Sequence, residues 1–324
     1  MKAAWYSRNG AARDVLVTGE VPMPEPGPGD VRVELRTSGV NPSDVKSRAR
    51  SPLAWSRVIP HSDGAGIIEK VGPNTDRQPG ERVWVWNGQW QRPMGTAAQF
   101  IVVPQEQAVP LPVGLSFEEG ACLGIPALTA IEAVRLAGDL AGKTILVTGA
   151  GNAVGHYVTQ LATQAGASVI GTAANASKQA HGLSAGAVSM IDYKREPLGQ
   201  RLLERTQGAG VDLIIDMDFS STSALLSQKV LKPHGRLICY GSNSTAALPV
   251  DLRTLLWSSL DLKWFLIYDL QNDARQYGLS YLGQLLEKGQ LQHTVAGTFA
   301  LDDIALAHEM VESGQKMGTV VITL

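Results

Sequence analysis

Between Lys143 and Ile267 short apolar runs alternate with amphipathic segments, and this alternation restricts the fold more than any other feature of the chain. The apolar runs read TILVTG, SVIGTA, VSMIDY, VDLIIDM, RLICYG and LKWFLI. Near-continuous apolar runs of this length are typical of strands that are buried on both faces. When helices separate such strands, the sheet is parallel and helices cover it. The sequence therefore predicts a doubly wound α/β domain in this region.

The first 115 residues have a different pattern. Val31, Val33 and Leu35 alternate with polar residues, and turn sequences such as PEPGPGD and QPGE interrupt the strand-like text. This pattern predicts an antiparallel β lobe. At Ser116 the period changes, because Ser116-Phe-Glu-Glu119 fits a capping box and the helical text that follows ends at Gly138.

The last part of the chain is helical and then extended. Residues 273–288 and 301–313 have helical patterns, and GTVVITL reads as a final strand. At 324 residues the chain is longer than one hydrophobic core usually grows, so we expect two domains.

Composition restricts the partners and the compartment. The net charge of −2 gives no reason to expect nucleic acid or anionic lipid, so a small-molecule partner is favoured. Cys122 and Cys239 both lie in apolar text, which excludes a disulfide framework or a cysteine-rich zinc lobe and favours a reducing compartment. There is no signal-like start and no apolar run of about 20 residues, so we expect a soluble, cytoplasmic protein.

A glycine-rich loop, TGAGNAVG, follows the strand TILVT and opens a helix that Gly166 ends. In this setting the free amide groups at the start of the helix bind a pyrophosphate, and small residues let the backbone approach it. Gly149, Gly151 and Gly155 give a GxGxxxG spacing, with Asn152 where such loops usually have glycine. Asn adopts left-handed conformations readily, so we expect the turn to tolerate it. The alternative is a strand-to-helix turn without a ligand.

The end of the next strand bears on the choice of cofactor. NAD sites usually carry Asp or Glu about 20 residues past the loop, to bind the ribose 2′-hydroxyl. Here Gly171-Thr-Ala-Ala174 has no carboxylate, and Lys178 follows as a countercharge for a 2′-phosphate. The sequence therefore favours NADPH. As the alternative, Lys178 is a solvated lysine at a helix end.

With these residues described, the chain resembles the medium-chain dehydrogenases/reductases, and among them the zinc-independent quinone oxidoreductases of the zeta-crystallin type. The resemblance rests on the order and spacing of SGVNPSD, IPHSDGAGIIEKVG, GIPALTA, GKTILVTGAGNAVG and AHEMVESGQKMGTVVITL. It implies a GroES-like, β-rich catalytic domain over residues 1–117 and 268–324, and a Rossmann NADP-binding domain over residues 118–267. It also implies an active site in the cleft between the two domains.

The resemblance also bears on metal binding. Asn41, Ser62 and Ile125 stand where zinc alcohol dehydrogenases have a cysteine, a histidine and a second cysteine, and none of the three is a good zinc ligand. His61 precedes the ligand position and is interpreted as an ordinary polar residue. We expect no metal.

Residue roles follow from the resemblance and from the loop. The residues expected on the substrate side of the nicotinamide are Asn41, Asp44 and Lys46. Asn41 either donates a hydrogen bond to a substrate carbonyl or caps a turn, and Lys46, where relatives often have tyrosine, either stabilises a product anion or lies in solvent. The residues expected to bind the cofactor are Thr129, Gly149, Gly151, Asn152, Ala153, Val154, Gly155, Thr172, Lys178, Tyr193, Gly241 and Ser242.

The apolar stretch from Leu260 to Leu270 is predicted to be the edge strand of the parallel sheet. In the family such edges pair across a two-fold axis, so a homodimer is expected, with an ordinary core strand as the alternative.

The leading functional hypothesis is an NADPH-dependent quinone oxidoreductase that works without zinc. The nearest alternative is an NADPH-dependent reductase of the double bond in α,β-unsaturated ketones, aldehydes or thioesters, since pocket walls decide between them. A third hypothesis is a non-catalytic NADPH-binding protein with a structural or regulatory role.

Overall fold

The computed structural model describes residues 1–244 and 246–324. Contacts among these residues group the chain into two compact units. The first unit is formed by Met1–Pro126 with His293–Leu324, and the second by Ala127–Gln292. Each unit is described here by itself.

The unit boundaries lie later in the chain than the sequence analysis placed them, at residues 126 and 292 rather than 117 and 267. Helix α10 (Asn272–Glu287) accounts for the second difference, because it packs against α4 (Leu128–Ala137). The segment after α10 is also held there, since Gln160 Nε2 donates to the Gln292 carbonyl at 3.1 Å and Gln160 Oε1 accepts from the Gln292 N–H at 2.8 Å.

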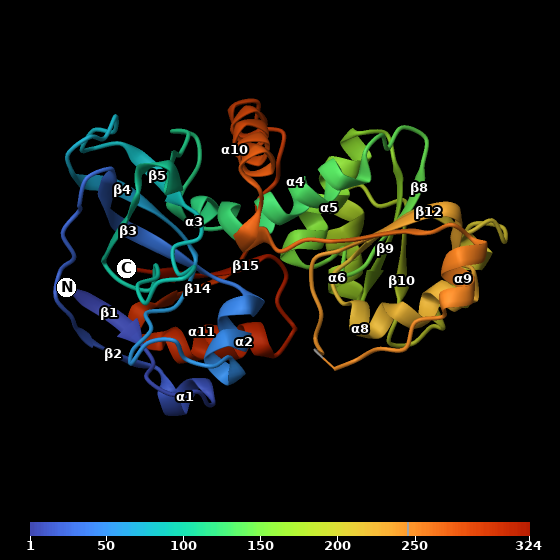
Figure 1. Cartoon of the computed structure of the whole chain (residues 1–324), viewed down its shortest axis with the longest axis horizontal. Helices are drawn as coiled ribbons and strands as arrows, with labels where there is room; N and C mark the ends of the chain where they lie inside the picture. The colour runs from blue at the N-terminus through green and yellow to red at the C-terminus, as the bar shows by residue number, and fades with distance from the viewer. Residues whose placement is uncertain (245) are drawn as a thin grey trace. The chain divides into compact units, whose positions relative to one another are not determined.

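The second unit contains a parallel sheet, as predicted (Figure 1). Within the described residues it has six strands in the order β10-β9-β8-β11-β12-β13. The strands are β8 (Thr144–Val147), β9 (Ser168–Ala173), β10 (Ser189–Asp192), β11 (Val211–Asp216), β12 (Leu231–Cys239) and β13 (Asp261–Trp264). Consecutive residues of β8 and β11 are buried, so both faces of the sheet are covered. The order reverses between β8 and β11, and ligands of open α/β sheets bind at such a point.

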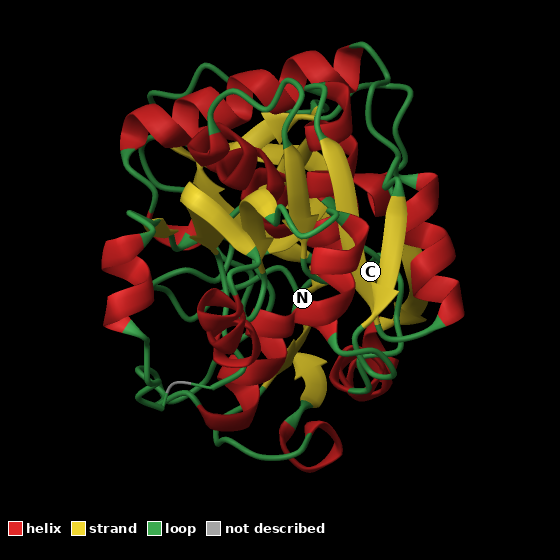
Figure 2. Cartoon of the chain, turned by 90° about the vertical axis from the view of Figure 1, so that its right-hand side faces the viewer, coloured by secondary structure: helices red, strands yellow, loops and turns green. Residues whose placement is uncertain are grey.

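Helices separate these strands along the chain, and Figure 2 shows helices in red and strands in yellow. The helices are α4, α5 (Ala153–Gln164), α6 (Ala176–Ser184), α7 (Leu198–Arg205), α8 (Phe219–Thr222), α9 (Leu252–Trp257) and α10, with the 3-10 helices η3 (Ser223–Gln228) and η4 (Ile267–Asp269). Helix α4 ends as predicted, because Gly138 adopts a left-handed φ of 74° at its C-cap. The strand predicted over Leu260 to Leu270 is present as β13 at one end of the sheet order, but it is shorter than predicted and ends at Trp264 before the turn η4.

The first unit is a β-rich domain that draws on both ends of the chain. Its larger sheet follows the order β14-β15-β3-β4-β5-β7, with β6 also paired to β3, and β1 pairs with β2 separately. The strands are β1 (Lys2–Trp5), β2 (Val17–Glu20), β3 (Asp30–Val40), β4 (Asp63–Val71), β5 (Arg82–Val85), β6 (Phe100–Pro104), β7 (Ala108–Pro110), β14 (Val295–Ala300) and β15 (Thr319–Thr323). Strand β15 runs antiparallel to β3, so the C-terminal segment completes the N-terminal sheet.

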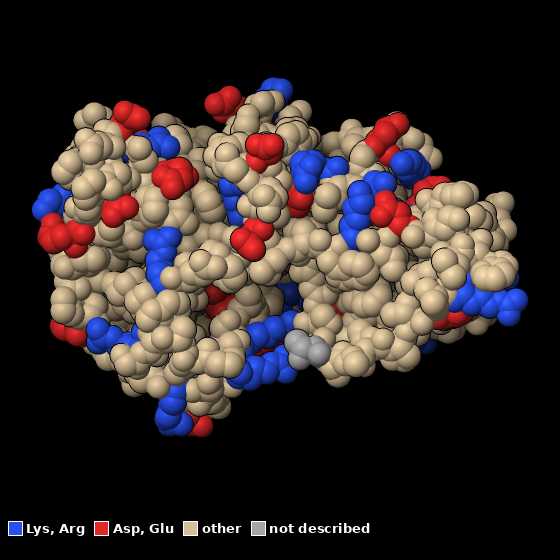
Figure 3. Space-filling model, in the orientation of Figure 1, with Lys and Arg blue, Asp and Glu red and all other residues tan. Residues whose placement is uncertain are grey.

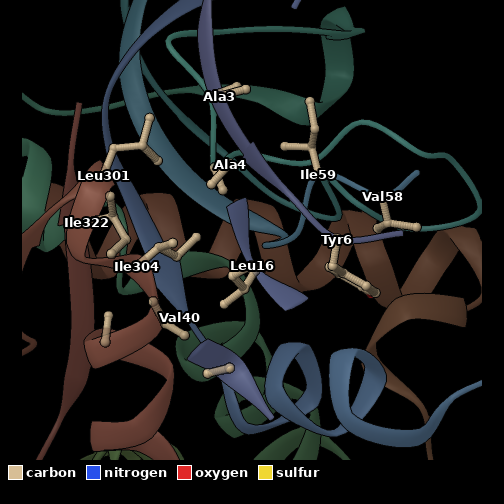
Figure 4. Close-up of a cluster of buried hydrophobic side chains, with 14 of the residues drawn as sticks. Ala3, Ala4, Tyr6, Leu16, Val40, Val58, Ile59, Leu301, Ile304 and Ile322 are labelled. Carbon is tan, nitrogen blue, oxygen red and sulfur yellow. The ribbon is translucent and has the colours of Figure 1, made fainter. Parts of the chain in front are cut away.

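Short helices complete the first unit. They are α1 (Ala12–Val15), α2 (Pro42–Arg50), η1 (Gln105–Gln107), α3 (Phe117–Gly120), η5 (Leu301–Asp303) and α11 (Ile304–Glu312). The π-helical turn η2 (Leu123–Ala127) belongs to this unit up to Pro126. The predicted capping box is present at α3, because the Glu119 N–H donates to Ser116 Oγ at 3.2 Å and the Ser116 N–H donates to Glu119 Oε2 at 2.8 Å. Figure 4 shows a core cluster in which Ala4, Val40 and Ile322 from both ends of the chain lie together.

Charged side chains of both signs appear on the face drawn in Figure 3, with large uncharged areas between them. This agrees with the net charge of −2. In the part of the chain that the structure describes, no helix combines the length and the apolar character needed to cross a bilayer.

Candidate functional site

The glycine-rich loop connects β8 to α5 in the second unit. Gly149 has a φ of +65°, in the left-handed region, and its N–H donates to Thr172 Oγ1 at 2.9 Å. Asn152 is extended, with φ −96° and ψ 170°, and its N–H donates to the Gly149 carbonyl at 2.8 Å. Asn152 therefore needs no left-handed conformation in this turn, because Gly149 takes that position and Asn152 is the N-cap of α5.

Close backbone packing explains the other two glycines. A Cβ on Gly151 would lie 2.3 Å from the Lys178 carbonyl oxygen, and a Cβ on Gly155 would lie 2.2 Å from that of Gly149. Both positions therefore require glycine. Ala153 and Val154 follow the loop as the first residues of α5, where backbone N–H groups have no acceptor within the helix. The arrangement is suited to a bound anion.

Lys178 lies against this loop rather than in solvent, so the solvated-lysine interpretation is wrong. Its side chain is 5% exposed, and Nζ donates to Asn152 Oδ1 at 2.6 Å. Burial lowers the pKa of the Lys178 ammonium. The backbone of Lys178 is held as well, because its N–H donates to Oδ1 of Asn175, the N-cap of α6, at 3.0 Å. The loop and the first turn of α6 are therefore packed and hydrogen-bonded to each other.

The remaining residues predicted to bind cofactor have different environments. Gly241 follows β12, and a Cβ on it would lie 2.7 Å from the Met217 carbonyl oxygen. Ser242 Oγ donates to the Ser244 carbonyl at 2.7 Å. Tyr193 follows β10 and is 47% exposed. Thr129 is buried in α4, and its Oγ1 has no hydrogen-bond partner among the described residues.

Two aspartates at the carboxyl end of β11, Asp216 and Asp218, hydrogen-bond to the segments that follow β8 and β12. The sequence analysis did not single them out. Asp216 Oδ1 accepts from Thr148 Oγ1 at 2.8 Å, and burial raises the pKa of the Asp216 carboxyl. Asp218 accepts from the N–H and from Nδ2 of Asn243, each at 2.8 Å, which ties the segment after β12 to the end of β11. The available signal was the position of these acidic residues directly after a buried parallel strand, where ligand sites form.

A histidine pair also borders the loop. His156 and His181 stack with ring centroids 3.8 Å apart and 2° between their planes. Nδ1 of His181 lies 3.1 Å from the Gly151 carbonyl oxygen. The pair therefore joins α5 and α6 beside the glycine loop.

In the first unit, Asn41 is held by two carboxylates. Its N–H donates to Asp44 Oδ2 at 2.7 Å, which is one half of a capping box at the start of α2. Its side-chain Nδ2 donates to Asp63 Oδ2 at 2.7 Å. Asn41 thus has the capping role that the sequence left open, and its side chain is also fixed in orientation.

Asp63 is the functional candidate that sequence reasoning missed. It is 0% exposed, and its oxygens accept from the Ile125 N–H at 2.9 and 3.0 Å in addition to Asn41 Nδ2. Burial raises the pKa of Asp63 to about 7. Asp63 lies in the quoted IPHSDGAG segment, so the signal was a carboxylate in otherwise small and apolar text.

Asp44 and Lys46 lie on α2 with different exposure. Asp44 is buried, and burial raises the pKa of its carboxyl well above its usual range, with Asp63 raising it further. Lys46 is half-buried. Their placement near a substrate remains a prediction.

The three positions matched to zinc ligands carry an amide, a hydroxyl and an alkyl side chain. Asn41, Ser62 and Ile125 are all buried, and Asp63 joins the first and the last by hydrogen bonds. Within residues 1–244 and 246–324, no group of three or more His, Cys, Asp or Glu side chains is arranged to hold a metal ion.

His61 has a partner that the sequence did not reveal. Its Nε2 lies 2.9 Å from Nε2 of His308, within hydrogen-bond distance. Thr96 Oγ1 donates its single hydrogen to the Asp63 carbonyl at 2.6 Å, so in its contact with Ser38 at 2.8 Å the Ser38 hydroxyl is the donor. Ser38 Oγ has then used its own hydrogen and accepts from His61 Nδ1–H at 2.9 Å. His308 Nε2–H then donates to His61, and both rings are neutral.

Two family profiles match the chain. Residues 27–113 match the alcohol dehydrogenase GroES-like domain, and residues 185–322 match a family described as zinc-binding dehydrogenase.

Individual relatives cover nearly the whole chain. A quinone oxidoreductase of Pseudomonas aeruginosa is 30% identical over 317 residues, covering 95% of each protein. A 2-haloacrylate reductase of a Burkholderia species is 27% identical over 336 residues, covering 99% of this chain and 98% of the relative. The crystal structure of Escherichia coli quinone oxidoreductase complexed with NADPH superposes with a TM-score of 0.89 at 26% identity, over 100% of both chains.

Proposed function

Since this chain belongs to the quinone oxidoreductase family of the medium-chain dehydrogenases/reductases, we propose that it transfers hydride from NADPH to a quinone. The observation that carries the proposal is the glycine loop, whose backbone geometry and buried lysine suit a phosphorylated dinucleotide. Membership of the family makes the chain an oxidoreductase, and we propose the quinone as its substrate and NADPH as its cofactor.

The residues of the second unit fit NADPH. The first-turn N–H groups of α5 would face the pyrophosphate, and Gly149, Gly151 and Gly155 let the backbone approach it. Strand β9 ends at Ala173 without a carboxylate, so a 2′-phosphate meets no repulsion there, and Lys178 supplies a cation. The Escherichia coli relative that superposes on this chain is a complex with NADPH, which supports the same choice.

When bound, NADPH supplies the hydride, and the protein contributes positioning and exclusion of water. We propose that Asn41 lies on the substrate side, with its amide held in one orientation by Asp63. The hydrogen bonds of Asp44 and Asp63 to Asn41 reduce the freedom of that residue, so little ordering remains for the substrate complex to impose.

We further propose that the reaction needs no zinc. The side chains of Asn41, Ser62 and Ile125 offer at most an amide oxygen and a hydroxyl, which are poor zinc ligands. Metal analysis of the purified protein together with a chelator control tests this: stoichiometric zinc that is required for turnover would contradict it.

The test of the main proposal follows NADPH absorbance with a panel of quinones beside a panel of enones and α,β-unsaturated acids. Turnover of quinones is the expected result. The similarity to a 2-haloacrylate reductase makes double-bond reduction the second candidate, and activity confined to the enone panel would replace the first proposal. Binding of NADPH without turnover of any acceptor would indicate a non-catalytic protein.

We also propose a cytoplasmic homodimer. Strand β13 forms an end of the parallel sheet, and Trp264 on it is 56% exposed, so a second copy would cover both an unpaired strand edge and an apolar ring. The cysteines Cys122 and Cys239 are free and buried, which suits a reducing compartment.

A further inference from the structure

A buried carboxylate without a cation lies in the first unit. Asp63 is fully buried, and none of the ion pairs found among the described residues involves it. Burying an unpaired carboxylate costs several kcal/mol of stability, and the rise of the Asp63 pKa to about 7 reflects that cost. An apolar residue would avoid the cost, so the carboxylate calls for a functional explanation.

The carboxylate joins two separate segments. Asn41, at the start of α2, donates from its side chain, and Ile125, in the π-helical turn η2, donates from its backbone. The two donors lie 22 and 62 residues from Asp63 along the chain. Asp63 therefore fixes the position of the Asn41 amide relative to η2.

The surrounding sequence accommodates this contact. A Cβ on Gly124 would lie 2.1 Å from Asp63 Oδ1, so only glycine lets the carboxylate reach the Ile125 N–H. A Cβ on Gly39 would lie 3.2 Å from the Asp63 Cβ and 2.3 Å from the Ala121 carbonyl oxygen. The backbone around the carboxylate is closely packed, and single π-helical turns occur often at functional sites.

We propose that Asp63 is a positioning residue for hydride transfer, because its carboxylate holds the Asn41 amide in the orientation that faces the substrate. The proposal rests on the proposed function, in which Asn41 lies on the substrate side. A turned amide would bring the Asn41 oxygen against a carboxylate oxygen, which is repulsive, so the hydrogen bond at 2.7 Å admits one orientation. Without the carboxylate the Asn41 amide can rotate, so the bound substrate adopts positions from which hydride transfer is slow.

The test uses Asp63→Asn, which keeps the size of the side chain. The new NH2 group would take the place of one carboxylate oxygen, and both oxygens lie within 3.0 Å of the Ile125 nitrogen, so it opposes at least one donor. The substitution also removes the negative charge that strengthens the bond from Asn41 Nδ2. The matched control is Thr96→Val, which removes a buried hydrogen bond to the main chain of the same residue, at 2.6 Å, and leaves the carboxylate in place. Each variant is characterised by kcat, the KM of the quinone, the dissociation constant of NADPH, the melting temperature, and the primary isotope effect with NADPH deuterated at the transferred position.

We expect Asp63→Asn to lower kcat by about ten- to a hundred-fold and to raise the isotope effect, with the dissociation constant of NADPH unchanged. Thr96→Val lowers the melting temperature and leaves kcat and the isotope effect unchanged. In an Asn41→Ala background Asp63→Asn lowers kcat no further, because both substitutions remove the same oriented amide.

Three results would overturn the inference while the proposed function stands. They are a wild-type kcat and isotope effect in Asp63→Asn, additive losses of kcat in the double variant, and an equal loss of kcat in Thr96→Val. If none of the acceptors supports oxidation of NADPH by the wild-type protein, the proposed function is overturned, and the inference about Asp63 is overturned with it.

Discussion

The ammonium group of Lys178 donates a hydrogen bond of 2.6 Å to the side-chain oxygen of Asn152, which stands in the glycine-rich loop where such loops usually have glycine. The lysine is 5% exposed, so its long side chain is already ordered before a ligand arrives. The bond to Asn152 thereby holds the ammonium beside the glycine-rich loop. Asn152 therefore acts as an anchor for the cation and not as a strained turn residue.

Removing this cation is expected to weaken NADPH selectively. Lys178→Ala should raise the dissociation constant of NADPH about ten- to a hundred-fold, the size of a charge-assisted hydrogen bond, and leave that of NADH within about threefold. Asn152→Ala should act in the same direction but less strongly, because it removes only the anchor. Fluorescence titration of both cofactors measures this. Lys288→Ala, which removes an exposed lysine at the C-cap of α10, is the charge-matched control. An equal loss of NADH affinity in Lys178→Ala would place Lys178 at the pyrophosphate instead.

A methyl group on Gly151 should disturb the loop. Its Cβ would lie 2.3 Å from the Lys178 carbonyl oxygen, so Gly151→Ala forces α6 and the loop apart at a cost of about 1–3 kcal/mol. We expect a lower melting temperature and a smaller rise of that temperature on adding NADPH. Gly283→Ala in α10, where nothing lies within 4 Å of the added Cβ, should keep wild-type NADPH binding. Normal cofactor binding in Gly151→Ala would show that the close approach is unnecessary.

The buried Asp63 should give stability a particular pH dependence. Its pKa of about 7 lies above the ordinary value near 4, so the folded state binds the proton more tightly than the unfolded state. The stabilisation that comes from proton binding by folded Asp63 is therefore fully present below about pH 4 and is lost as pH rises to about 7. This loss lowers the free energy of unfolding by up to about 4 kcal/mol. The difference in urea unfolding free energy between wild type and Asp63→Asn, followed from pH 4 to 8, should show this slope. A flat difference curve would mean that Asp63 titrates normally.

The buried histidines His61 and His308 should change the pH dependence of stability in the opposite direction to Asp63. Burial lowers the pKa of His308 to about 3 and that of His61 well below its usual value, so both rings stay neutral in the folded protein. Their contribution is present above about pH 6.5 and is lost as pH falls toward the folded pKa values, because only the unfolded chain takes up protons. His308→Gln should reduce this acid sensitivity relative to wild type. Chemical denaturation between pH 7.5 and 5 measures the effect, and identical slopes for the two proteins would count against it.

The proposed dimer has a direct test at the edge strand. Trp264→Glu places a charge on β13, where the side chain is 56% exposed, and should convert the dimer to monomer in light scattering. Val113→Glu, at an 88% exposed position in the first unit, should remain dimeric. A wild-type protein that is monomeric at micromolar concentration would contradict the proposal itself.

Sequence reasoning succeeded where the signal is local. The strand and helix around the glycine loop, the capping box between Ser116 and Glu119, and the helix end at Gly138 all depend on residues a few positions apart. Periodicity and backbone hydrogen bonding over such distances are encoded in neighbouring residues. The sequence did not indicate which residue of the loop is left-handed, and the structure gives that position to Gly149 and not to Asn152.

By itself the sequence determined the two kinds of architecture, the place of the glycine-rich loop between a strand and a helix, and the absence of a carboxylate after β9. Strand and helix patterns lie in neighbouring residues and can be read without tertiary contacts. Only the tertiary structure decided that Asp63 joins Asn41 to Ile125 and that His61 meets His308, 247 residues away. Such pairs form when the sheet and its helices pack, and neither partner carries a local pattern that points to the other. The hydrogen-bond partners and the pKa values of the buried Asp63, His61 and His308 therefore depend on that packing.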